Sequence, residues 1–281
     1  MAGEFDEARA KLGHAREHAD RLSEEALALH DPELRQPITW TTTFNADENC
    51  FDVSIASVRE PPRRLGLILG DAVDNFRSAL DHVAWRLAGH GRPGARPRSR
   101  ARFPIVNSPA AFRRAEVQDT ISQIDVTHIE TIERLQPYRQ VFTNDVLHPL
   151  AALRAMSNRG RYRLLDVVLV PAELQISIAA VPQGCRVIAL DLNAEAVTKP
   201  PVAGVRVARY YTGSTTGNPE LTLHVGGGYL AVDGIVSVDD RLERIGRCVE
   251  EVIETFEGAF GDGADLGEPA AVSAHLAERA R

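Results

Sequence analysis

The sequence has few cysteines, no long apolar run and an acidic start. Its three cysteines, Cys50, Cys185 and Cys248, are widely spaced and form no CxxC pair, which argues against a disulfide framework and a cysteine-rich zinc site. No apolar stretch approaches the roughly 18 residues that a membrane-spanning helix needs. The first residues also lack the basic and apolar parts of a signal peptide. We therefore expect a cytoplasmic protein that makes no contact with membranes.

Lysine is almost absent, although basic residues are not. Of the 32 basic residues only Lys11 and Lys199 are lysines, and 39 acidic residues bring the formal net charge to −7. This charge argues against a protein that covers nucleic acid with its whole surface, so any such contact must be local. The chain also lacks a P-loop, a GxSxG motif and a dinucleotide-binding fingerprint. No cofactor is therefore expected.

What the sequence does contain is a succession of helical and strand-like patterns, which predicts an α+β fold. With 281 residues, 44% of them hydrophobic, the chain can bury a full core in one or two domains. Pro149 is well placed to begin one of the helices. The elements expected up to residue 169 are a helix over 5–30, a hairpin with strands at 38–44 and 51–58, a helix from Leu65 to the AGHGRPG stretch, short helices over 112–123 and 126–138, and a longer helix over 147–169.

From about residue 175 to 236, β-rich runs separated by turn residues predict an antiparallel meander. The glycine run at 226–228 and the GNPEL stretch at 217–221 are interpreted as turns. Ser237 is expected to cap a last amphipathic helix that packs back on the bundle. The fold is thus a helical bundle with an N-terminal β-hairpin and a β-rich antiparallel C-terminal half closed by a long amphipathic helix. Its regions are a motif-bearing helical region at 1–170 with the hairpin at 38–58, a β-rich region at 171–236, the closing helix at 237–260 and a flexible tail at 261–281.

The stretch GDAVDNFRSALDHVAW, residues 70–85, keeps the apolar spacing of a helix but is unusually polar on its other side. Solvated helix faces usually hold Lys, Glu and Gln, whereas this arc holds Asp, Asn and Ser, which are poor helix formers. Trp85 lies in the middle of the arc, and a wholly exposed Trp is unusual. A solvated face, a buried polar network and a ligand site all fit this pattern. The polar residues of the arc are Asp71, Asp74, Asn75, Arg77, Ser78, Asp81 and His82.

This stretch and the later FPI, LQPY and SNRGRYRLL segments resemble a large family of uncharacterised bacterial proteins. In that family a GDxxHNxRSALDHxxW helix is followed by FPI, LQPY and NxDKHR segments, and the resemblance spans most of residues 1–170. It implies a site that joins the two polar segments. The matching positions include Gly70, Asp71, Asn75, Arg77, Asp81, His82, Asn158 and Arg163.

The chain also departs from the family pattern. Asp74 stands where the family usually has His, and Gly160 and Tyr162 replace the Asp and His of the second segment. If those residues do chemistry in the relatives, this chain has lost it.

The RSALDH segment places His82 five residues after Arg77. This spacing resembles the motif of the HEPN superfamily ribonucleases, helical bundles that pair two such motifs across a dimer. The resemblance implies a homodimer that cleaves or binds RNA without a metal. Arg77 and His82 would be catalytic, His82 as acid or base at the ribose 2′-hydroxyl and Arg77 on the phosphate. Binding roles would fall to Asp71, Asn75, Ser78, Asp81, Asn158, Arg161 and Arg163.

Two arginine-rich segments favour a local RNA contact. Five arginines lie between Arg92 and Arg102, directly after the motif helix, and four more between Arg154 and Arg163. Against this contact, the three aspartates of the arc lie beside Arg77, where they would pair with it and repel phosphate.

Two other classes of function stay open. The first is a non-catalytic binding or interaction protein, in which the polar helix face is a structural network or a ligand surface. The second is a metal-dependent hydrolase built on the aspartates of the arc, although Arg77 in the same arc makes a cation less favourable there. His14 and His18 stand one helical turn apart without a third ligand at a fixed spacing, and we interpret them as a surface pair.

Overall fold

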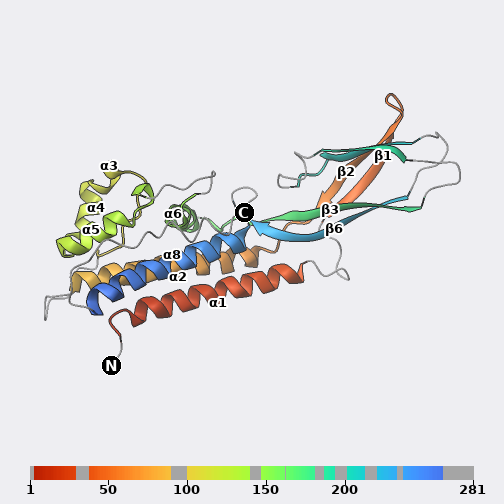
Figure 1. Ribbon diagram of the computed structural model, residues 1–281. Coiled ribbons are helices and arrows are strands. Elements are labelled where there is room, and N and C mark those ends of the chain that lie inside the picture. Colours follow the sequence, from red (N-terminus) through yellow and green to blue (C-terminus); the bar gives the residue numbers. More distant parts are fainter. Residues whose placement is uncertain are drawn as a thin grey trace. The chain divides into compact units, whose positions relative to one another are not determined.

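The computed structural model confirms the α+β class (Figure 1). It describes residues 3–29, 38–89, 100–139, 147–161, 163–180, 187–193, 201–212, 220–232 and 237–261. The chain divides into two compact units, each made of segments that are distant in sequence. The first unit comprises Met1–Gly13, Phe76–Ala151 and Arg247–Arg281, and the second comprises His14–Asn75 and Ala152–Gly246. Apart from Gly261, which the structure includes in the last helix, the predicted tail at 261–281 lies outside the described residues.

Most of the predicted helices are present. The expectation of one helix over 147–169 is wrong, because the helix ends at Gly160 and the chain is a strand from Val168. Glycine favours helix ends, and the apolar, β-branched run that follows suits a strand. The helices are α1 (Asp6–Ala28), α2 (Arg63–Gly89), α3 (Pro109–Phe112), α4 (Ala115–Ile121), α5 (Val126–Arg134), the 3-10 helix η1 (Pro137–Arg139), α6 (Pro149–Gly160) and α8 (Val238–Gly261).

The long helices bury the apolar stripes that their sequences predict. On α2 the stripe opposite the polar arc, Val73, Phe76, Leu80, Val83 and Leu87, is buried throughout. The stripe of α8 is buried in the same way at every position from Leu242 to Phe256 that its helical spacing predicts. The Asp240 amide also donates to Ser237 Oγ over 3.5 Å, in agreement with the predicted cap. None of the helices in the described part of the chain combines the length and hydropathy of a membrane span.

Within each unit, α1 lies beside α2 and α8. In the first unit Glu4, just before α1, pairs with Arg86, Arg9 of α1 pairs with Glu257, and Glu7 Oε2 lies 3.2 Å from His82 Nδ1. In the second unit Glu25 Oε2 lies 2.7 Å from Arg64 Nε, and Ser23 Oγ donates to Asp239 Oδ1 over 2.6 Å. The three helices therefore pair through polar contacts at the rim of their apolar stripes.

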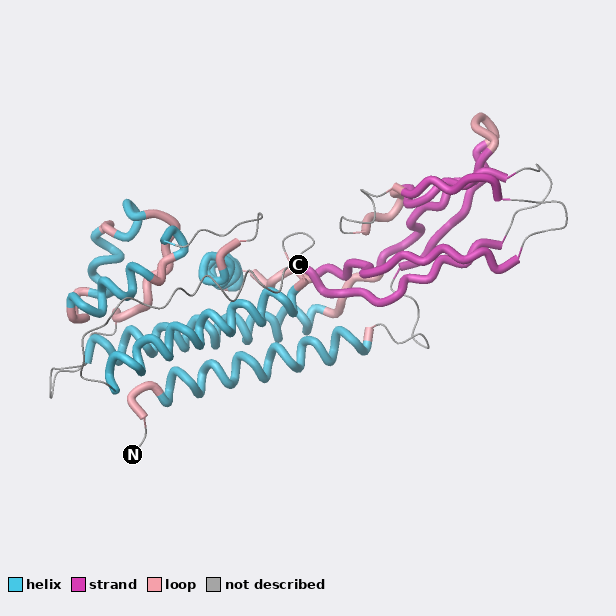
Figure 2. The backbone as a smooth tube through the Cα atoms, in the orientation of Figure 1, coloured by secondary structure: helices cyan, strands magenta, loops and turns pink. Residues whose placement is uncertain are grey.

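All described strands belong to the second unit (Figure 2). The N-terminal hairpin is confirmed, but the predicted meander is wrong, because the hairpin recruits β5 and the strand β3 pairs with β6. The order of the four-stranded antiparallel sheet is β1-β2-β5-β4. The strands are β1 (Ile38–Asn45), β2 (Cys50–Val58), β3 (Val168–Ala180), β4 (Val187–Leu192), β5 (Arg206–Thr212) and β6 (Glu220–Ala231).

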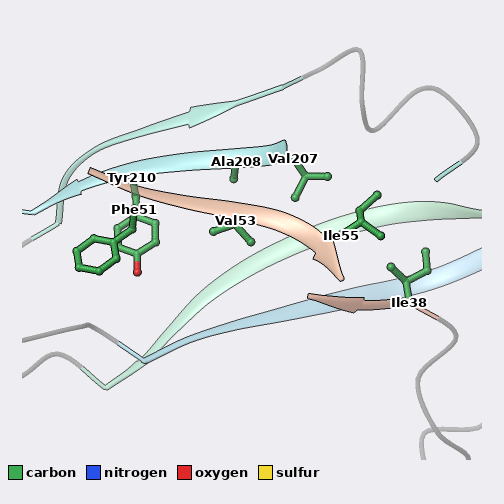
Figure 3. Packing of buried hydrophobic residues seen from close by; sticks show 7 residues of the cluster. All are labelled: Ile38, Phe51, Val53, Ile55, Val207, Ala208 and Tyr210. Atoms are coloured by element: carbon green, nitrogen blue, oxygen red, sulfur yellow. The ribbon is translucent and has the colours of Figure 1, made fainter. Parts of the chain in front are cut away.

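The apolar face of the hairpin explains why it recruits β5. Val53 and Ile55 of β2 are buried together with Val207 and Tyr210 of β5 (Figure 3). The Phe51 and Tyr210 rings stack with centroids 5.0 Å apart and planes 9° apart. A two-stranded hairpin cannot cover such a face alone, so a strand from far along the chain completes the core.

The glycine run is part of a strand and not the predicted turn. Gly226 and Gly228 lie within β6, opposite Glu173 and Pro171 of β3. Proline has no amide hydrogen, so Pro171 donates no hydrogen bond to this ladder. The first residues of the GNPEL stretch lie outside the described part of the chain.

Candidate functional site

Arg77 connects α2 to a segment that follows it in the sequence. Its Nη2 donates to Asp81 Oδ1 over 2.8 Å and to the Phe103 carbonyl over 2.6 Å, and the Phe103 amide donates to Asp81 Oδ1 over 3.0 Å. The side chains of Arg77 and Asp81 are only 15% and 28% exposed. The Arg–Asp pair therefore satisfies both backbone polar groups of a buried phenylalanine.

The same segment is bound from its other side by Gln136, which is fully buried. Gln136 Nε2 donates to the carbonyls of Pro104 and Ile132, and the Val106 amide donates to Gln136 Oε1, each over 2.9 Å. Residues 103–106, which we call the FPIV segment, are buried and have no strand ladder. The RSALDH, FPI and LQPY motifs thus meet in one network that satisfies the backbone of this segment.

Gln136 is the main residue that the sequence analysis missed. Its motif, LQPY, was noted only as part of the family resemblance. The available signal was a lone amide side chain in the sequence IERLQPY, where a polar residue next to apolar ones needs partners if it is buried.

His82 makes its contact on a different side of α2 from Arg77. Its Nδ1 lies 3.2 Å from Glu7 Oε2 of α1, and its side chain is 34% exposed. Five helical positions rotate the side chain by about 140°, so Arg77 faces the FPIV segment while His82 faces α1. The structure therefore gives the two predicted catalytic residues separate neighbours.

Trp85 on α2 and the arginines that precede Phe103 flank this network in the sequence. Trp85 is 42% exposed and stands one helical turn after Asp81 and His82. Arg102 is exposed and directly precedes Phe103, and the exposed Arg100 lies with its Nη1 3.4 Å from Asp119. We call His82, Trp85, Arg100 and Arg102 the Trp85 surface. Ser78 is half-buried on the same side of α2, and the other arginines of this loop lie outside the described residues.

The remaining predicted residues of α2 belong to the second unit. Asp71 and Asp74 are exposed, and Asn75 Nδ2 donates to the Asp71 carbonyl over 2.8 Å, as a bond within the helix. Desolvation raises the pKa of the Asp74 carboxyl, the Arg161 guanidinium opposes this shift, and the Asp71 carboxylate adds to it. Arg161 follows the end of α6, so the two polar segments of the family resemblance interact at this point.

The predicted binding residues of the second polar segment are exposed. Asn158 and Arg163 are exposed like Arg161, and Tyr162 lies outside the described residues. A Cβ atom at Gly160 would meet no heavy atom within 4 Å, so packing does not require glycine there. A Cβ atom at Gly66, by contrast, would lie 2.5 Å from the Leu165 carbonyl, which shows how closely α2 approaches the chain after α6.

The aspartates of the arc form no metal centre. Across the described ranges, no group of three or more His, Cys, Asp or Glu side chains could hold a metal ion. His14 Nδ1 lies 3.0 Å from the exposed Glu17, as a surface pair. Comparison of the chain with protein-family models, with curated proteins and with solved structures finds no match.

Proposed function

We propose that the protein binds single-stranded RNA through the Trp85 surface, and that the Arg77–Asp81 pair maintains the fold instead of cleaving the RNA. The observation that favours this function is the 42% exposed indole of Trp85 on the helix that binds Phe103, together with the exposed arginines at positions 100 and 102 just before Phe103. Every base offers a ring face, so stacking on an aromatic side chain is tolerant of sequence and contributes about 1–3 kcal/mol per base.

The arginines of the Trp85 surface supply the electrostatic part of the binding. Arg100 and Arg102 can contact phosphates on either side of a stacked base. The sequence has further arginines, Arg92, Arg96 and Arg98, between the end of α2 and Arg100. The nearby carboxylate of Glu4 is paired with Arg86, which reduces its repulsion of a polyanion.

The arrangement of Arg77 favours binding over cleavage. Catalysis by an Arg and His pair requires both groups on one phosphate and its ribose. Here the guanidinium donates to Asp81 and to the Phe103 carbonyl, so a phosphate would have to displace a carboxylate that is already hydrogen-bonded. The homodimer that the HEPN resemblance implies stays a prediction.

Binding can be tested with a fluorescein-labelled, mixed-sequence single-stranded RNA titrated with the protein in EDTA. We expect binding by the wild type, a loss of roughly ten- to hundredfold in affinity for Trp85→Ala, and near-normal affinity for Trp85→Phe, which keeps a ring for stacking. Trp40, the other tryptophan of the chain, is only partly exposed in the sheet, and Trp40→Phe is the matched control. A wild type that does not bind RNA contradicts the proposal.

Cleavage is tested in the same EDTA buffer with end-labelled RNA and a folded His82→Ala variant. We expect the RNA to stay intact with both proteins. Cleavage by the wild type that disappears in His82→Ala would instead assign the helix a catalytic role and overturn the non-catalytic part of the proposal.

A further inference from the structure

We infer that Arg77 and Asp81 are positioning residues, which act on RNA binding through Phe103 by fixing where Arg102 and Arg100 leave the fold. This inference rests on the proposed function. It assigns the most prominent charged pair of the motif helix a role in the ligand site without any contact between that pair and the ligand.

The first residue of the FPIV segment is held by α2 through both of its backbone polar groups. The Phe103 amide is bonded to Asp81, and the Phe103 carbonyl is bonded to Arg77, one helical turn earlier on α2. Arg102 directly precedes Phe103 in the sequence, and Trp85 follows Asp81 by one helical turn.

Arg77 differs in exposure from the arginines that precede Phe103. The Arg77 side chain is only 15% exposed and is bonded within the fold, whereas Arg100 and Arg102 are exposed. A phosphate of the RNA can bind the exposed Arg102 without breaking a hydrogen bond of Phe103, and at Arg100 it has to displace the exposed Asp119, which lies 3.4 Å away. The pair on α2 is thus suited to orient the arginines and not to bind the phosphate itself.

Two separate sets of side chains hold the backbone of the FPIV segment by hydrogen bonds. Gln136 binds Pro104 and Val106, while the Arg77–Asp81 pair binds Phe103, at the end next to Arg102. Removal of the pair should therefore release this end and leave the rest of the segment in place.

The salt dependence of RNA binding tests this inference, because its slope reports the number of phosphate contacts. For Arg77→Gln we expect about tenfold weaker binding, and a slope of log K against log salt that is shallower by about 1.4, the loss of two single-strand phosphate contacts. The matched control is Arg209→Gln, which removes an arginine of similar exposure, 13%, from an Asp pair in the sheet. Its slope should stay at the wild-type value.

A double-mutant cycle separates positioning from direct contact. If Arg77 acts through the exposed arginines, Arg77→Gln should have almost no further effect on the slope in an Arg100→Gln/Arg102→Gln background. An additional decrease of about 0.7 in that background would mean that Arg77 contacts a phosphate itself, and it would overturn the inference.

A second variant covers the case in which Arg77→Gln does not fold. Arg77→Met combined with Asp81→Leu removes both partners of Phe103 without leaving a lone charge, and we expect the same shallower slope. If this variant binds RNA normally and with an unchanged slope, the inference is overturned and the proposed function still stands. Absence of RNA binding by the wild type overturns the proposed function, and the inference with it.

Discussion

Among the described residues, Arg77–Asp81 in the first unit and Arg209–Asp52 in the second are half-buried Arg–Asp pairs that differ in what they connect. In the first unit Arg77 bonds to Asp81 and to the Phe103 carbonyl. In the second unit Arg209 bonds to Asp52 through Nε and Nη2, over 2.7 and 3.1 Å, and its Nη1 bonds to Glu48. The arginine side chains are almost equally exposed, at 15% and 13%.

The difference lies in the backbone beside each pair. Asp52 and Arg209 are register partners in β2 and β5, so the backbone ladder already connects the two strands. The FPIV segment has no ladder, and the side chains of α2 and Gln136 provide its backbone hydrogen bonds. Removal of the two ion pairs should therefore change the free energy of unfolding by different amounts. The Arg77–Asp81 pair supplies backbone hydrogen bonds that a ladder would otherwise make, whereas the Arg209–Asp52 pair does not.

Removal of Arg77 should have the largest effect on stability. Arg77→Met leaves the Asp81 carboxylate without its cation and the Phe103 carbonyl without its donor, and we expect a loss of about 2–4 kcal/mol in the free energy of unfolding. Urea unfolding followed by circular dichroism measures this loss. Adding Asp81→Leu should restore part of it, and a double variant no more stable than Arg77→Met would show that the lone charge is not the cause.

Removal of Arg209 should cost less, about 1–2 kcal/mol. Asp52 keeps a second cation, since Arg206 Nη1 lies 3.5 Å from its Oδ1, and the strands keep their ladder. The same urea experiment on Arg209→Met gives the comparison directly. A loss larger than that of Arg77→Met would refute the view that the ladder makes this pair less important.

The smallest of these changes in the free energy of unfolding is expected in mild acid, which acts on a histidine of the first unit. Burial lowers the pKa of His148, whose Nδ1 accepts the Leu150 amide, to about 4. A lowered histidine pKa means that the unfolded chain binds the proton first, so stability is full above pH 6.5 and falls between pH 6.5 and about 4. At pH 5.5 the expected loss is about 1 kcal/mol. Hydrogen bonds from Arg209 lower the pKa of Asp52, so its contribution is lost only in stronger acid, below the ordinary carboxyl range.

Urea unfolding at pH 7 and 5.5 measures this loss. In His148→Asn, whose amide oxygen can still accept the Leu150 amide, the difference between the two pH values should disappear. An unchanged pH dependence in this variant would assign the effect to another group.

The local elements were predictable because their signals are local. The apolar stripes of α2 and α8, the hairpin and the Ser237 cap follow from spacing and residue type over a few turns. The pairing of β2 with β5 and of β3 with β6 was not predictable in the same way, because the alternation that identifies a strand does not identify its partner.

The site was predictable in composition but not in its contacts. The polar arc of α2 and the exceptional position of Trp85 follow from helical periodicity. The partners of Arg77 do not, because one of them is a backbone carbonyl, at Phe103, and every residue of the chain has such a group. The sequence alone leaves both a catalytic centre and a structural network open for the arc, because it does not identify the Phe103 carbonyl as a partner of Arg77.

The order of the four-stranded sheet has a consequence for the synthesis of the chain on the ribosome. The hairpin is complete at Val58, but its partner strand β5 begins only at Arg206. At about 5–20 residues per second, the hairpin waits roughly 7–30 s for that strand. During this time the side chains of Val53 and Ile55 have no β5 to cover them. A nascent chain of this protein should therefore be a client for chaperones that bind exposed β-strands near the exit tunnel.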